Sequence, residues 1–223
     1  MSLNNGSYHV EAILFDMDGT IVDSSIPVHK AWKAWADSVD LDFDSVLAVM
    51  HGRRAIETMQ MLKPELPQPQ SAERFLAVEA LDFEGIVEIP GAGAFIASLP
   101  VGRWGVVTSA TQSMARDRIR AAGLPIPDVL VSADMVAHGK PHPECFLRAA
   151  QLLGVAPGAC LAFEDAPAGI EAAKAAGMAV IGVETHYPGA ELGTQEAIRD
   201  FRSVTGESGA DGGIRVMLKL ALD

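Results

Sequence analysis

Two aspartates, Asp16 and Asp18, follow a short apolar run in the segment ILFDMDGT, residues 13–20. Burying acidic side chains beside apolar residues costs free energy unless a hydrogen bond, an opposite charge or a metal compensates them. Acids at such a position therefore suggest a function. If the apolar run is a buried strand, both acids lie at its carboxyl end, where open parallel sheets bind ligands. At that position one carboxylate could attack phosphorus and form an aspartyl-phosphate. The second could protonate the leaving oxygen and later activate water.

Other candidate groups follow apolar runs further along the chain. They are two hydroxyls, an ammonium and two acids: Thr108 and Ser109, Lys140, and Glu164 with Asp165. Carboxylates gathered in one crevice repel each other unless a cation lies among them, and Mg²⁺ prefers a few carboxylates together with water and phosphate oxygens. Hydroxyls and a lysine suit a phosphoryl group as fixed hydrogen-bond donors. These groups therefore predict a magnesium site that binds a phosphorylated ligand.

Short apolar runs indicate the strands that would position these groups. The runs are Ala12–Phe15, Trp104–Thr108, Val129–Val131, Cys160–Phe163 and Val180–Val183. Helical patterns follow three of them, over Met114–Ala122, Glu144–Leu153 and Ala168–Ala176. Proline near a helix start and glycine just past its end support these assignments. The alternation predicts an α/β fold with a Rossmann-like parallel sheet and helices on both faces.

A helical segment interrupts this alternation between Val22 and about Glu88. Apolar residues recur there at helical spacing, and for Trp32 and Trp35 the pattern favours core packing over ligand stacking. We predict an all-helical cap domain over residues 24–88, inserted after the first strand. The catalytic core would comprise residues 10–23 and 89–223. The two chain crossings between core and cap are predicted to act as a hinge.

Both ends of the chain have weaker patterns. Residues 1–9 are polar at the start and are predicted to be a disordered tail. The segment Val204–Gly213 is rich in Gly, Ser and acids and is predicted to be a loop. The final segment, Ile214–Leu222, fits either a strand or a short helix.

Composition limits the classes of partner and compartment. The chain has 223 residues, of which 49% are hydrophobic, enough for a sizeable core and a smaller domain. A net charge of −12 argues against nucleic acid and acidic membranes as partners. Two cysteines without a CxxC pair favour a reducing compartment. With no signal pattern and no run of membrane-spanning length, we expect a cytoplasmic monomer or weak homodimer acting on a small phosphorylated substrate.

The chain resembles the haloacid dehalogenase-like phosphatases over nearly its whole length. The resemblance is carried by four blocks in the family's order: DMDGT at 16–20, VVTS at 106–109, GKP at 139–141 and FEDAPAGI at 163–170. A helical insertion at this position is similar to the cap of the family's phosphoglucomutase-like and sugar-phosphatase branch. The resemblance therefore implies the same Rossmann-like core, a cap domain and Mg²⁺ as cofactor.

The resemblance also implies a role for each matching acid. Asp16 would be the nucleophile and a metal ligand. Asp18 would be the general acid and base, and its backbone carbonyl would bind Mg²⁺. Asp165 would be a further magnesium ligand, although an acid there could also simply cap the next helix. Glu164 would be either a metal ligand or a hydrogen-bonded group that orients one.

The remaining matches imply contacts with the substrate. Lys140 and Ser109 would bind the phosphoryl group, with Thr108 and Gly19 assisting. In the cap, the segment MHGRRA at 50–55 looks like bacterial and yeast phosphatases that act on hexose, 2-deoxyglucose and glycerol phosphates. That similarity implies that His51, Gly52 and Arg53 bind the substrate. The neighbouring Arg54 would be either a substrate contact or a surface charge.

Two alternatives to a phosphatase follow from the same blocks. A phosphosugar mutase of the β-phosphoglucomutase type shares all of them and would return the phosphoryl group to another hydroxyl. A regulatory protein that kept the fold and lost turnover would be expected to lack one of the acids or the lysine. Since Asp16, Asp18, Ser109, Lys140 and Asp165 are all present, an enzyme is favoured over a regulatory protein. The shared blocks do not separate phosphatase from mutase, but the cap segment looks more like that of the phosphatases.

Overall fold

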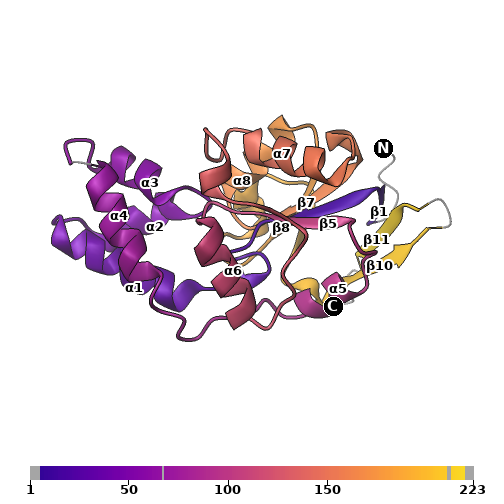
Figure 1. The fold of residues 1–223 in the computed structure, drawn as a ribbon, viewed down its shortest axis with the longest axis horizontal. Coiled ribbons are helices and arrows are strands. Elements are labelled where there is room, and N and C mark those ends of the chain that lie inside the picture. Colours follow the sequence, from indigo (N-terminus) through magenta and orange to yellow (C-terminus); the bar gives the residue numbers. More distant parts are fainter. Residues whose placement is uncertain (1–5, 67, 210–211, 219–223) are drawn as a thin grey trace.

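The computed structural model describes residues 6–66, 68–209 and 212–218 (Figure 1). Its centre is a six-stranded sheet in the order β6-β5-β2-β7-β8-β9, in which neighbouring strands are parallel. In sequence order the strands are β2 (Ala12–Phe15), β5 (Trp104–Val107), β6 (Val129–Val131), β7 (Cys160–Glu164), β8 (Ala179–Val183) and β9 (Ala197–Ile198). The predicted α/β fold is confirmed, with five of these strands close to their predicted positions.

Helices cover both faces of this sheet because its strands have apolar side chains on both sides. In β2, Ile13 and Phe15 face one apolar cluster, whereas Ala12 and Leu14 face the other. The first cluster is closed by α5 (Ala92–Ala97) and α6 (Gln112–Ala121), and the second by α7 (Glu144–Leu153) and α8 (Pro167–Ala175). Figure 1 shows the two pairs above and below the sheet. The short helix α9 (Gly189–Leu192) follows β8.

Four helices form a separate lobe on the left of Figure 1. They are α1 (Ser25–Ser38), α2 (Phe43–Met50), α3 (Ala55–Leu62) and α4 (Gln68–Glu79). This lobe, called the cap below, has its own apolar cluster, in which Trp32 and Trp35 are buried and the ring centroids of Trp32 and Phe75 lie 4.4 Å apart. Packing of the two tryptophans in the cap core is therefore confirmed.

The two crossings between the cap and the sheet lie side by side. They form the antiparallel pair β3 (Val22–Asp23) and β4 (Val87–Glu88), with Val22 opposite Glu88. The cap thus follows β2 and β3 in the chain, and its two covalent connections to the core lie next to each other. A two-stranded connection of this kind fixes where the cap is attached.

The predictions for the two chain ends were wrong in part. Strand β1 (Ser7–Val10) pairs with β11 (Ile214–Leu218), which also pairs with β10 (Val204–Ser208) in a second, antiparallel sheet. Residues 7–9 are therefore not a disordered tail, and residues 204–208 are not a loop. The strand alternative for residues 214–218 is correct, whereas residues 1–5 and 219–222 lie outside the described residues.

The missed strands share a physical cause. Each has polar residues on one side and only a few buried side chains, such as Val10, Ile214 and Val216. The pairing of β1 with β11 joins segments about 200 residues apart, and β10 pairs with β11 as a neighbouring strand, so the local pattern carries little of the signal for this sheet. Within the described part of the chain, no helix combines the length and apolarity needed to cross a bilayer.

Candidate active site

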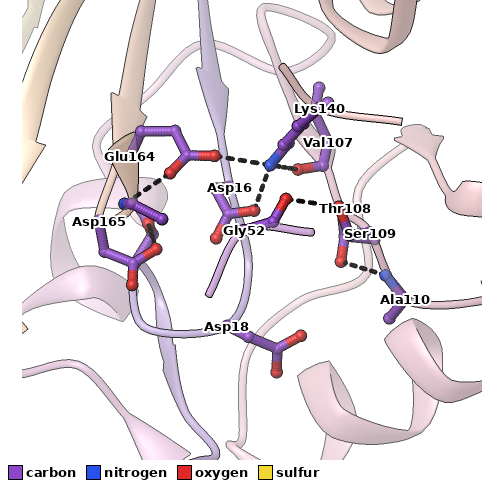
Figure 2. Close-up of polar contacts among 12 residues, drawn as sticks. Asp16, Asp18, Gly52, Val107, Thr108, Ser109, Ala110, Lys140, Glu164 and Asp165 are labelled. Carbon is purple, nitrogen blue, oxygen red and sulfur yellow. Dashed lines mark hydrogen bonds and ion pairs between the residues drawn. The ribbon is translucent and has the colours of Figure 1, made fainter. Parts of the chain in front are cut away.

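The centre of the site is a buried ion pair at the carboxyl ends of the middle strands. The ammonium of Lys140 lies 2.5 Å from Oδ1 of Asp16 and 2.7 Å from Oε1 of Glu164. It also donates to the carbonyl oxygen of Val107 at 3.2 Å (Figure 2). The Lys140 side chain is only 1% exposed. The structure therefore brings together groups from β2, from the end of β7 and from the loop that follows β6.

Burial and charge act in opposite directions on these groups. Burial raises the pKa of Asp16 to about 7, and the nearby Glu164 acts in the same direction, whereas Lys140 opposes the shift. Burial also lowers the pKa of Lys140, but the carboxylates of Asp16 and Glu164 outweigh it, so the net pKa is raised. The lysine therefore stays charged and favours the ionised Asp16 that a nucleophilic attack needs.

Asp165 lies beside Asp16 and is held by two side chains. Its Oδ2 lies 2.6 Å from Nδ1 of His186, and the hydroxyl of Thr20 donates to its Oδ1 at 3.4 Å. Burial raises the pKa of Asp165 to about 6, although the hydrogen bond from His186 lowers it. Helix α8 has Ala166 at its N-cap and no side-chain capping bond, so Asp165 does not cap it.

Gly19 is required by the approach of the chain to Asp165. Its φ of +85° lies in the left-handed region, and a Cβ there would stand 2.3 Å from Oδ2 of Asp165. No side chain could occupy that space without displacing the carboxylate. Glycine is thus required at position 19 for a steric reason, whereas its predicted part in binding the phosphoryl group stays a prediction.

The residues present fit a magnesium ion. Carboxylate oxygens of Asp16, Glu164 and Asp165 lie within 4.8 Å of one another, and all three residues are buried. Such a set of hard oxygen ligands suits Mg²⁺. Glu164, however, accepts from Lys140 with one oxygen and from the Ala166 amide with the other at 3.0 Å. Asp16 and Asp165 are thus the better candidates for ligands, and Glu164 for an orienting group.

Asp18 is turned away from this cluster, as Figure 2 shows. Both of its carboxylate oxygens accept from Nη1 of Arg118 at 3.0 Å, and Oδ1 also accepts from the Ser24 hydroxyl at 2.6 Å. The other terminal nitrogen of Arg118 donates to Oε1 of Glu79 at 2.9 Å. Arg118 therefore links an acid of the core with an acid of the cap.

Sequence reasoning missed Arg118, Glu79 and His186 as members of the site. One signal was available for Arg118, which lies four residues after Met114 and next to Ile119 on the apolar face of α6. A charge on that face needs a buried partner. His186 and Glu79 gave no such signal, because their partners are distant in sequence.

The cap loop contacts the residues predicted to bind phosphate. The Ser109 hydroxyl donates to the carbonyl oxygen of Gly52 at 2.9 Å, and a Cβ on Gly52 would lie 2.8 Å from that of Ala166. The Gly52 φ of +75° also requires glycine. The Thr108 hydroxyl oxygen accepts from the Ala110 amide at 3.0 Å and shapes the turn after β5. Figure 2 shows both contacts beside Asp16.

A cavity of about 90 Å³ lies between the cap and these strand ends. It is lined by Asp16, Asp18 and Ser109 from the core and by His51 and Arg53 from the cap, among others. The predicted substrate residues His51, Gly52 and Arg53 therefore line the same cavity as Asp16 and Asp18. Arg54 instead donates to the carbonyls of Val136 and Ala137, at 3.1 and 3.2 Å, and supports the contact between cap and core.

Magnesium is expected to stabilise the protein more at about pH 8 than at about pH 5. The folded-state pKa values of Asp16 and Asp165, about 7 and about 6, lie above the ordinary value of 3.8. As pH rises from about 4 to 7, the unfolded chain loses these protons first, so metal-free stability falls. Bound Mg²⁺ replaces the protons once the acids ionise.

Thermal unfolding with and without excess MgCl₂ measures this effect. The increase in Tm should be near zero at the lower pH and several degrees at the higher one. Asp165→Asn should remove most of the increase. Equal increases at both pH values, or an undiminished increase in Asp165→Asn, would show that the metal binds elsewhere.

Comparison with known proteins agrees with this geometry. A family model for "haloacid dehalogenase-like hydrolase" matches residues 10–177. Hexitol phosphatase A of Escherichia coli is 42% identical over 178 residues, which is 78% of this chain and 82% of that protein. Glycerol-1-phosphate phosphohydrolase 2 of Saccharomyces cerevisiae is 33% identical over 193 residues, which is 81% and 77% of the two chains. A hydrolase from Pseudomonas syringae superposes with a TM-score of 0.76 at 26% identity, covering 86% and 94%. The chain belongs to the haloacid dehalogenase-like hydrolases.

Proposed function

We propose that the protein is a magnesium-dependent phosphatase that hydrolyses small sugar or polyol phosphate monoesters through an aspartyl-phosphate. The observation that carries this proposal is the buried Asp16–Lys140–Glu164 cluster with Asp165 beside it, because Asp16 of this cluster lines the cavity between the cap and the core. The cavity gives room for the uncharged sugar or polyol part of the substrate, called its tail below. The ion cluster gives a nucleophile beside a fixed positive charge. Relatives named as hexitol and glycerol-1-phosphate phosphatases support the substrate class.

In the proposed reaction, Asp16 attacks phosphorus in line and breaks the ester bond. Asp18 donates its proton to the leaving alcohol oxygen, then removes a proton from the water that hydrolyses the aspartyl-phosphate. Lys140 holds the Asp16 carboxylate in place and offers positive charge to the phosphoryl oxygens. A magnesium ion, when bound by Asp16, Asp165 and the backbone carbonyl of Asp18, supplies Lewis-acid charge neutralisation.

The phosphoryl group would be bound by groups at the two neighbouring strand ends. Ser109 would donate its hydroxyl once the contact with the Gly52 carbonyl is released, and Thr108 would keep the turn in shape. Gly19 leaves the space that lets the chain approach Asp165. In this proposal residues 24–88 form a cap domain that opens and closes by bending at the β3–β4 pair, and the reaction takes place in the cytoplasm.

The cap loop is proposed to determine which tail is accepted. His51 and Arg53 border the cavity, and burial lowers the pKa of His51 to about 3, so it is a neutral hydrogen-bonding group. A neutral imidazole and a guanidinium suit the hydroxyls of a polyol. Arg53→Ala is therefore expected to change the ranking of substrates, lowering kcat/KM for preferred ones by about tenfold.

Steady-state kinetics over five or more sugar and polyol phosphates would measure this ranking. The matched control is Arg74→Ala, a change of the same kind on helix α4 at an exposed position outside the cavity lining. A uniform decrease for all substrates would contradict a role for Arg53 in specificity.

A phosphate-release screen tests the proposed function. The protein is assayed against small phosphomonoesters with Mg²⁺ and with a chelator. The proposal predicts ranked activity with the metal and none without it. Failure to hydrolyse any ester with Mg²⁺ would favour the regulatory alternative. Appearance of an isomerised sugar phosphate in place of inorganic phosphate would favour the mutase, although the relatives compared above are named as phosphatases.

A further inference from the structure

Arg118 occupies an unusual position for a charged side chain. It lies on α6 with only 4% of its side chain exposed, and it contacts acids from two different parts of the molecule. Asp18 follows β2 in the core, whereas Glu79 is the last residue of α4 in the cap and is 7% exposed. Arg118 and Glu79 are buried, whereas the Asp18 side chain is 27% exposed. Because burying a charged pair is costly even with close pairing, this arrangement needs a reason beyond stability.

The contact with Asp18 conflicts with catalysis in this position. A general acid must come within hydrogen-bond reach of the oxygen that leaves the phosphorus at Asp16. In the structure both carboxylate oxygens of Asp18 are held by Arg118, and Ser24 holds one of them as well. Charge-assisted contacts to both oxygens are among the strong hydrogen bonds of proteins. Asp18 must leave them before it can act.

A substrate bound in the cavity could release Asp18 from Arg118. Asp18, Glu79 and Arg118 all line the space between cap and core, together with the apolar rings of Trp32 and Phe75. A substrate tail in that space would contact the guanidinium, and its hydroxyl oxygens could accept the hydrogen bonds that Asp18 now receives. Movement of α4 would shift Glu79 and thereby draw Arg118 from Asp18. A phosphate ester without a tail could do neither.

We propose that Arg118 is a positioning residue that holds Asp18 away from Asp16 and that, through Glu79, makes its release depend on the cap and on the substrate tail. The inference rests on the proposed function, in which Asp18 is the general acid and base. Its consequence is selectivity for tailed substrates over small phosphate donors. Arg118 and Glu79 take no part in the chemistry and affect selectivity only by controlling the position of Asp18.

Acetyl phosphate is the probe for this device because it has no polyol tail. Its acetate leaves as an anion without a proton, so the phosphorus–oxygen bond breaks as Asp16 takes the phosphoryl group. Water then attacks the aspartyl-phosphate, and Asp18 accepts the proton of that water, giving inorganic phosphate. With this substrate Asp18 acts only in the hydrolysis step, so kcat for acetyl phosphate measures its activity as a general base.

Arg118→Met combined with Glu79→Gln removes the paired charges together. We expect this variant to raise kcat for acetyl phosphate by about tenfold. This factor corresponds to the free energy of one hydrogen bond to a charged group, which Asp18 no longer has to break. The kcat/KM for glycerol 1-phosphate should fall. Adding Asp18→Asn should abolish the gain, because it works only through Asp18. Arg120→Met, on the exposed side of the same helix, is the matched control and should change neither rate.

The single variant Arg118→Lys provides a second measurement if the double variant folds poorly. It keeps the charge but cannot reproduce the guanidinium fork, so a smaller gain in the same direction is expected. Equal losses for acetyl phosphate and glycerol 1-phosphate in the folded variants would overturn the inference, as would a gain that persists with Asp18→Asn. A wild-type protein inactive on both substrates with Mg²⁺ would instead refute the proposed function.

Discussion

Asp16→Asn is expected to lower phosphate release by about 10⁴-fold or more, the order seen when a catalytic nucleophile is removed. The amide cannot form the aspartyl-phosphate, so the proposed route through Asp16 is lost rather than weakened. The change is nearly isosteric, and its amide oxygen can still accept from Lys140, although the ion pair is lost. Steady-state phosphate release with Mg²⁺ and a preferred polyol phosphate gives the measurement.

The fold of this variant should survive. Burial already disfavours the charged form of Asp16, as its raised pKa indicates, and a neutral amide avoids that cost. We therefore expect a metal-free Tm equal to or above that of the wild type at about pH 8. Asp128→Asn, at an exposed position outside the cavity lining, is a matched control that should retain turnover. Activity of Asp16→Asn within tenfold of the wild type would remove Asp16 as the nucleophile.

Lys140→Met is expected to have the second largest effect, on both activity and stability. Its ammonium compensates two buried carboxylates at 2.5 and 2.7 Å, and removing one partner of a buried pair typically costs about 3–5 kcal/mol. Phosphate release should fall by about 10²–10³-fold, as for loss of one preorganised charge contact in a transition state. Urea unfolding and steady-state kinetics measure the two effects.

A control and a metal test sharpen this prediction. Lys33→Met removes a lysine whose pair with Asp37 is largely exposed, and it should change stability by at most about 1 kcal/mol. Excess Mg²⁺ should restore part of the stability of Lys140→Met, because it can neutralise the acids that the ammonium leaves behind. If Lys140→Met were as stable as Lys33→Met, the ion cluster would not be the energetic centre of the site.

The parts of the site that lie at strand ends could be predicted from the sequence. Asp16 and Lys140 each follow an apolar run, and parallel strands bring such positions to the same edge. The convergence of these groups thus depends on topology, which the alternation of strands and helices indicates. The same reasoning located helices α7 and α8 to within a residue or two.

Side-chain direction could not be predicted in this way. Asp16 and Asp18 are two residues apart, yet one carboxylate faces Lys140 and the other faces Arg118. The separation follows from the turn after β2, where Gly19 has a positive φ, and from partners that lie 100 and 124 residues away. Likewise, His186 joins the site only because β8 brings its following loop beside Asp165. Such contacts depend on the packed structure.

The second sheet shows the same limit at the level of the fold. Strands β1 and β11 pair from opposite ends of the chain, and each has a mixed polar pattern that also suits a loop. Burial on one face is enough for a strand once a partner is in place, but the local pattern does not identify the partner. The pairing of the two chain ends was therefore not predictable from the local pattern.

The most direct test of the proposed mechanism is to trap the phosphorylated protein. Wild-type protein is mixed with a ³²P-labelled polyol phosphate and Mg²⁺, quenched in acid within milliseconds, digested and examined by mass spectrometry. The mechanism predicts a hydroxylamine-sensitive phosphoryl group on Asp16, absent without Mg²⁺ and absent in Asp16→Asn. Turnover without any label, or a label on a residue other than Asp16, would contradict it.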